Sequence, residues 1–145
     1  MEVQTTRFGR VEFAAEDVFC FPEGLPGLAA CRDWVILSEG NDAAVAWLQS
    51  VQRPEIGLAV VCPRRFVPGY RLRVARRELV PLELDTPKGA LLLAVVTKTA
   101  RALALNLRAP VVINLDRRLG RQVTARGSLP MQHELDNTPA LKKTA

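Results

Sequence analysis

Short apolar stretches alternate along the chain with turn-forming residues, and few of them have the spacing of a helix. Residues 10–13 (Arg-Val-Glu-Phe) alternate polar and apolar side chains, the period-two pattern of a half-buried strand. Residues 52–55 (Gln-Arg-Pro-Glu) have turn composition and separate two apolar stretches, which predicts a β-hairpin. Strands spaced about ten residues apart are typical of an all-β barrel or sandwich. The predicted strands are residues 10–13, 17–21, 35–37, 44–51, 56–62, 71–74, 91–97, 102–107, 111–115 and 122–125.

Helical patterns are rare in this sequence. We expect one or two helical turns over residues 28–33, and a short helix within residues 75–84, which Pro81 interrupts. A chain of 145 residues has the usual size of a single domain. We assign residues 1–126 to one β-domain and residues 127–145, where the sequence turns polar, to a flexible C-terminal tail.

The charge is unevenly distributed along the chain, although the net charge is only +5. Residues 1–62 carry four basic and nine acidic groups, a net charge of −5. Residues 63–145 carry 16 basic and six acidic groups, a net charge of +10. Two interpretations remain open. Either the protein has an acidic and a basic face for different partners, or the two halves interleave in the fold and their charges partly cancel.

The inventory of reactive side chains excludes most kinds of catalytic site. The only histidine, His133, lies in the predicted tail, where nothing would hold it in a Ser-His-Asp triad. The three cysteines lack the spacing of a zinc site, and we expect them to be small buried residues. We therefore expect no catalytic residue, no metal and no cofactor.

No stretch of the chain is long enough to span a membrane. The longest apolar run, residues 90–96, has seven residues, whereas a membrane helix needs about 20. No signal peptide is visible at the N-terminus, so we expect a cytoplasmic protein without a membrane partner.

The arginines of residues 64–77 and 117–126 raise the alternative of direct RNA binding. Proteins that bind single strands interleave basic side chains with exposed aromatic rings, on which the bases stack. Only Phe66 and Tyr70 lie near these arginines. We therefore expect no direct nucleic-acid contact, and RNA binding through this basic half stays as an alternative.

Five short motifs carry a family resemblance. Residues 6–9 read Thr-Arg-Phe-Gly, and residues 21–27 read Phe-Pro-Glu-Gly-Leu-Pro-Gly. Trp-Leu-Gln-Ser follows at 47–50, Asn-Leu-Arg-Ala-Pro-Val-Val-Ile-Asn at 106–114 and Gly-Arg-Gln-Val at 120–123. In this order the chain resembles the FliW family of flagellar assembly factors over about residues 5–126. The resemblance implies an all-β fold, a single antiparallel β-barrel-like domain with one or two short helices, and no enzymatic activity.

The resemblance also implies two protein partners. Members of the FliW family bind flagellin, and they bind the RNA-binding translational repressor CsrA at a place away from its RNA groove. Once flagellin has been exported, the freed factor captures CsrA and flagellin translation resumes. We therefore expect a monomeric protein that binds flagellin and CsrA. A flagellin chaperone without a translational role is a further alternative.

The candidate contact residues lie in the acidic half of the chain. Prolines and glycines fix the backbone of residues 22–27, which indicates either a rigid projecting contact or a structural corner. Residues 49–50 either contact a partner or satisfy the backbone at a strand end. Because CsrA presents a basic surface, we expect it to meet acidic side chains. The candidate residues are Glu16, Asp17, Phe21, Pro22, Glu23, Gly24, Leu25, Gln49, Ser50 and Glu55.

Overall fold

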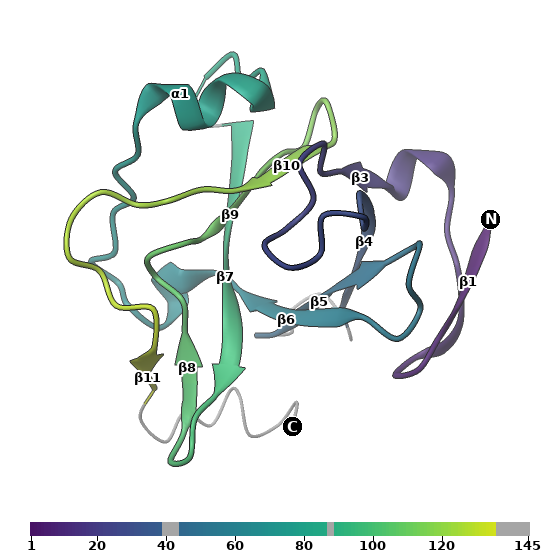
Figure 1. Ribbon diagram of the computed structural model, residues 1–145, viewed down its shortest axis with the longest axis horizontal. Coiled ribbons are helices and arrows are strands. Elements are labelled where there is room, and N and C mark those ends of the chain that lie inside the picture. Colours follow the sequence, from purple (N-terminus) through teal and green to yellow (C-terminus); the bar gives the residue numbers. More distant parts are fainter. Residues whose placement is uncertain (39–43, 87–88, 136–145) are drawn as a thin grey trace.

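The computed structural model describes residues 1–38, 44–86 and 89–135, and a closed β-barrel forms its centre (Figure 1). Seven strands make the barrel, in the spatial order β7 (Ala90–Lys98), β6 (Gly57–Val61), β5 (Ala46–Ser50), β4 (Asp33–Ser38), β3 (Phe19–Cys20), β10 (Leu119–Gln122) and β9 (Val111–Asn114). Strand β9 pairs back with β7 and closes the ring. Within the described chain these pairings are antiparallel, except for the short parallel pairing of β3 with β10. The predicted all-β, barrel-like fold is confirmed.

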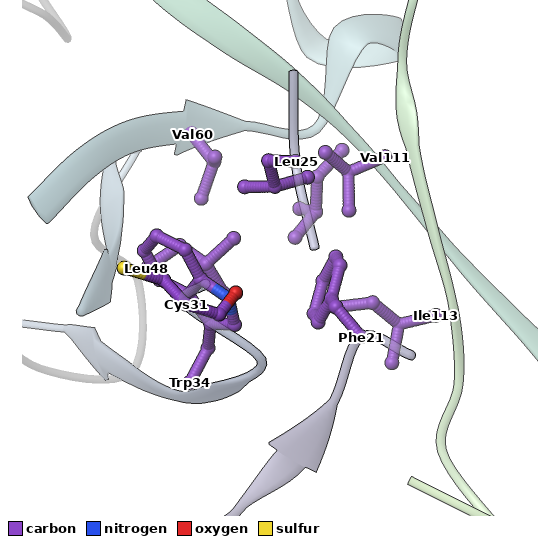
Figure 2. Close-up of a cluster of buried hydrophobic side chains, with 9 residues drawn as sticks. Phe21, Leu25, Cys31, Trp34, Leu48, Val60, Val111 and Ile113 are labelled. Atoms are coloured by element: carbon purple, nitrogen blue, oxygen red, sulfur yellow. The ribbon is translucent and has the colours of Figure 1, made fainter. Parts of the chain in front are cut away.

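The barrel interior is filled from two sources (Figure 2). The strands supply one part of the core, and the loop between β3 and β4 supplies the other. The indole N–H of Trp34 donates to the carbonyl of Cys31 over 3.0 Å, so the largest core side chain satisfies its polar group. The buried core residues are Phe21, Leu25, Cys31, Trp34, Leu48, Val60, Leu93, Val111 and Ile113.

A two-strand extension leaves the barrel at the end of β7. Strand β8 (Leu103–Leu105) pairs with the last residues of β7, and β11 (His133–Glu134) pairs with β8. The predicted flexible tail from residue 127 onward is therefore wrong as far as residue 135. The reason is apolar packing, because Leu129 and Leu135 join the same hydrophobic cluster as Leu105. Residues 136–145 of the predicted tail lie outside the described residues.

A separate N-terminal hairpin covers one side of the barrel (Figure 1). It consists of β1 (Glu2–Thr5) and β2 (Gly9–Glu12), of which only the second was predicted. Its turn packs on Trp47 of β5: the Phe8 ring meets the indole edge-on, with centroids 5.9 Å apart. The Arg7 guanidinium carbon lies 4.0 Å from the indole centroid, which is cation–π distance. Trp47 is thus half-buried beneath the hairpin rather than inside the barrel.

Helix is as scarce as the sequence indicates. Helix α1 (Arg76–Leu79) runs into a 3₁₀ turn at Val80–Leu82, which confirms the short helix predicted within residues 75–84. The helical turns predicted over residues 28–33 are wrong. Tight turns occupy this stretch instead, because Gly27 has φ +78° and the N–H of Leu28 bonds back to the carbonyl of Leu25.

Three predicted strands differ in the structure. Residues 71–74 join no ladder in the described chain, and they lead directly into α1. The strand predicted over 17–21 shrinks to Phe19–Cys20, because Ala15–Asp17 forms a 3₁₀ turn. The strand predicted over 122–125 occurs three residues earlier, as β10.

Candidate protein-interaction surface

The loop of residues 21–27 turns inward rather than projecting. Phe21 is fully buried, Leu25 is nearly so, and the buried Gly24 lies between them. Figure 2 shows Phe21 beside Ile113 inside the barrel, with Leu25 among the other core side chains. The contact role predicted for Phe21, Gly24 and Leu25 is therefore wrong, because these residues offer no surface to a partner. The structural-corner interpretation fits, and only Pro22 and Glu23 of the candidates in this loop are exposed.

Gln49 and Ser50 are also buried, and they hold the turn between β5 and β6 together. The Gln49 amide donates to the carbonyls of Ser50 and Pro54, both over 3.0 Å. The Ser50 hydroxyl accepts a hydrogen bond from the N–H of Arg53, also over 3.0 Å. Of the two interpretations left open, satisfying the backbone at a strand end is the one that the geometry favours.

Replacing Gln49 with alanine is expected to lower the free energy of unfolding by about 2 kcal/mol, because the buried carbonyl of Ser50 and the partly buried carbonyl of Pro54 lose their donor. Urea unfolding followed by circular dichroism measures this change. Gln52→Ala is the matched control. Its exposed amide bonds to the partly exposed Asp33, so we expect a smaller loss. Equal losses in the two variants would contradict the structural role of Gln49.

The exposed candidates Glu16 and Asp17 lie at the open end of the N-terminal hairpin. Asp17 accepts a hydrogen bond from the N–H of Ala14 over 2.9 Å, which fixes the 3₁₀ turn. A surface hollow beside this turn is lined by Glu2, Arg10, Glu12 and Asp17, among others. We call Glu2, Glu12, Glu16 and Asp17 the acidic patch.

Sequence reasoning missed two members of the acidic patch. Glu2 and Glu12 are direct partners across the β1–β2 pair, where like charges repel each other. Arg10 relieves this repulsion by forming ion pairs with both carboxylates. The signal was present in the alternation of residues 2–5, which pairs with residues 9–12 once a turn is placed between them.

Glu23 lies in a different electrostatic setting. Its carboxylate forms an ion pair with Arg121 of β10 over 3.2 Å, and Arg121 also donates to the carbonyl of Glu78 over 2.6 Å. The Arg118 guanidinium reaches the carbonyl of Glu16 over 3.4 Å. Here the basic half of the chain interleaves with the acidic half, so the charge of Glu23 is partly cancelled.

Glu55 lies apart from the acidic patch. It sits in the turn after β5 and pairs with Arg53 over 3.1 Å. A backbone hydrogen bond and then the Arg53 side chain lower the pKa of Glu55 below its ordinary value. The N-terminal hairpin contacts the same turn, because the N–H of Thr6 donates to the carbonyl of Pro54. Glu55 therefore lies at the turn end of the hairpin, whereas Glu16 and Asp17 lie at its open end.

The described part of the chain shows no constellation for metal chemistry. No group of three or more His, Cys, Asp or Glu side chains in residues 1–38, 44–86 and 89–135 could hold a metal ion. The three cysteines are free, and the predicted burial is wrong for Cys62, which is exposed. No helix among the described residues is long and apolar enough to cross a membrane.

Comparison with known proteins identifies a family that shares this fold and these motifs. The family model described as FliW protein matches residues 2–135. The flagellar assembly factor FliW of Bdellovibrio bacteriovorus is 39% identical over 124 residues, covering 84% of this chain and 71% of the relative. The FliW of Natranaerobius thermophilus is 30% identical over 147 residues, covering 98% and 97% of the two chains.

A solved structure agrees with the sequence comparisons. A crystal structure of the flagellar assembly factor FliW superposes with a TM-score of 0.86 at 28% identity, covering 94% of this chain and 97% of the other. This chain belongs to the FliW family of flagellar assembly factors.

Proposed function

We propose that this flagellar assembly factor acts in the cytoplasm by binding flagellin and the translational repressor CsrA in turn. Captured CsrA no longer represses flagellin synthesis, so synthesis follows export. The observation that carries this proposal is the family match over residues 2–135, which includes the motifs on which the expectation of these partners was based.

We assign the acidic patch to CsrA. A protein that binds RNA needs basic surface for the phosphates, and complementary charge speeds association and selects the partner. All four carboxylates of the patch are exposed, and Arg10 is the basic residue that lines the same hollow. Within the described chain, the Glu16 carboxylate forms no ion pair and is free to meet a cation.

Co-elution on a size-exclusion column tests the partners. The purified protein is mixed with CsrA, with flagellin, and then with both. We expect a complex with each partner alone, and release of CsrA when flagellin is added. Binding of flagellin without CsrA would support the chaperone alternative. Binding of neither partner would contradict the proposal and favour the alternative of direct RNA binding through the basic half.

Charge reversal tests the assignment of the acidic patch. We expect Glu12→Lys with Glu16→Lys to weaken CsrA binding about tenfold, because attraction becomes repulsion. The fold should persist, since the exposed pair of Glu12 with Arg10 contributes little stability. The control, Asp85→Lys with Asp116→Lys, makes the same charge change at exposed positions in the basic half of the chain and should bind CsrA normally. Unchanged affinity in the first variant would overturn the patch and leave the choice of partners standing.

A further inference from the structure

Helix α1 lies at one end of the barrel (Figure 1). An apolar groove with an arginine rim lies beside this helix. Two adjoining hollows share part of their lining and together form this groove. Helix α1 is only four residues long, and Ala90 and Leu92 of β7 stay partly exposed beside it. The apolar lining consists mainly of Leu72, Val74, Leu79, Leu84, Leu92 and Val112.

Three arginines line the groove beside these apolar side chains: Arg64, Arg73 and Arg126. Arg64 donates to the carbonyl of Tyr70 over 3.2 Å. In the described chain, none of the three forms an ion pair with a carboxylate. Among the described residues the lining includes no aspartate or glutamate, and the glutamate of α1, Glu78, pairs with Arg121 instead. The rim therefore consists of three exposed cations that no carboxylate among the described residues neutralises.

The segment that carries the groove is firmly held. The N–H of Arg126 donates to the carbonyl of Arg73 over 2.6 Å, joining both rim arginines through the backbone. The Tyr70 hydroxyl donates to the carbonyl of Leu107 over 2.9 Å, and burial raises the pKa of this tyrosine. A groove fixed in this way needs little reordering when a ligand enters.

We propose that this groove docks a protein segment that carries aliphatic side chains flanked by aspartates or glutamates. Covering the apolar floor with aliphatic groups removes apolar surface from water, which stabilises the complex. The guanidinium groups pair with carboxylates in bidentate fashion. Nucleic acid fits less well, because the described residues of the lining include no aromatic side chain on which a base could stack. This surface is distinct from the acidic patch, so one molecule offers complementary sites to a basic and to an acidic partner.

Fluorescence anisotropy tests the groove on the full chain. The probe is a fluorescein-labelled amphipathic peptide with leucines along one face and glutamates along the other. We expect saturable binding, weakened at least tenfold by Arg73→Glu with Arg126→Glu. The control, Arg32→Glu with Arg101→Glu, makes the same charge change at exposed positions outside the groove and should bind as the unmodified chain does.

Methyl NMR spectra of the unmodified chain locate the peptide independently of any variant. We expect shifts at the methyl groups of Leu72, Val74, Leu79 and Leu92. The proposal is overturned if no saturable binding occurs, if the shifts fall elsewhere, or if a peptide with lysines in place of the glutamates binds as tightly. Binding of an oligouridylate that the rim variant abolishes, without binding of the acidic peptide, would make the groove a nucleic-acid site and overturn the proposal as well.

Discussion

Gly120→Ala is expected to destabilise the barrel by about 3 kcal/mol, the upper end of the usual cost of overpacking a core. A Cβ atom on Gly120 would stand 2.3 Å from Cζ of Phe21 and 2.4 Å from its Cε1, far inside van der Waals contact. Phe21 is fully buried between β10 and the core, so its ring has no free space to enter. Such a loss is a large share of the roughly 5–15 kcal/mol that holds a domain folded. Chemical unfolding measures it.

A double-mutant cycle identifies the cause. Phe21→Leu removes the ring atoms that the new methyl group would meet, so Gly120→Ala should cost clearly less in that background than in the unmodified chain. Gly69→Ala serves as the control, because a Cβ atom there has no neighbour within 4 Å and stability should hardly change. Additive effects of the Phe21 and Gly120 substitutions would contradict the proposed contact.

The Phe21–Gly120 contact shows which part of the fold the sequence could not provide. The alternation and turn patterns predicted most of the barrel strands, because the alternating burial of a strand depends only on residues that are neighbours in the sequence. The motifs around Phe21 and Gly120 are each visible in the sequence, yet nothing local joins residues so distant along the chain. In the structure Gly120 lies within β10, and its lack of a side chain makes room for the Phe21 ring.

The candidate contact residues divide for a similar reason. Polar side chains such as Gln49 were equally compatible with a partner contact and with a buried turn, and only the tertiary fold distinguishes the two. Local charge pointed to Glu16 and Asp17, which are indeed exposed. Pairing across the hairpin brings Glu2 and Glu12 into the acidic patch. The ion pair with Arg121 partly cancels the charge that Glu23 would offer to a partner. Composition counts charges along the chain, whereas a partner meets the charges that the fold leaves uncompensated.

Gly24→Ala is expected to cost about 3 kcal/mol as well, through a different mechanism. Gly24 has φ +64°, in the left-handed region, where a side chain costs about 1–2 kcal/mol. A Cβ atom there would also stand 2.6 Å from Cα and 2.8 Å from the carbonyl oxygen of Ala29. Because these are backbone atoms, no rotamer change relieves the clash, and the loop that carries Phe21 and Leu25 into the barrel must shift.

Gly27 provides the matched control for Gly24 within the same loop. It has φ +78°, but a Cβ atom there would find no neighbour within 4 Å. Gly27→Ala should therefore cost only the conformational part, about 1 kcal/mol, and the difference between the two variants measures the steric part. Thermal unfolding of both variants would reveal the difference as a clearly lower midpoint for Gly24→Ala. Equal midpoints would mean that the loop relaxes freely, and the inward-facing loop would then not be a fixed part of the core.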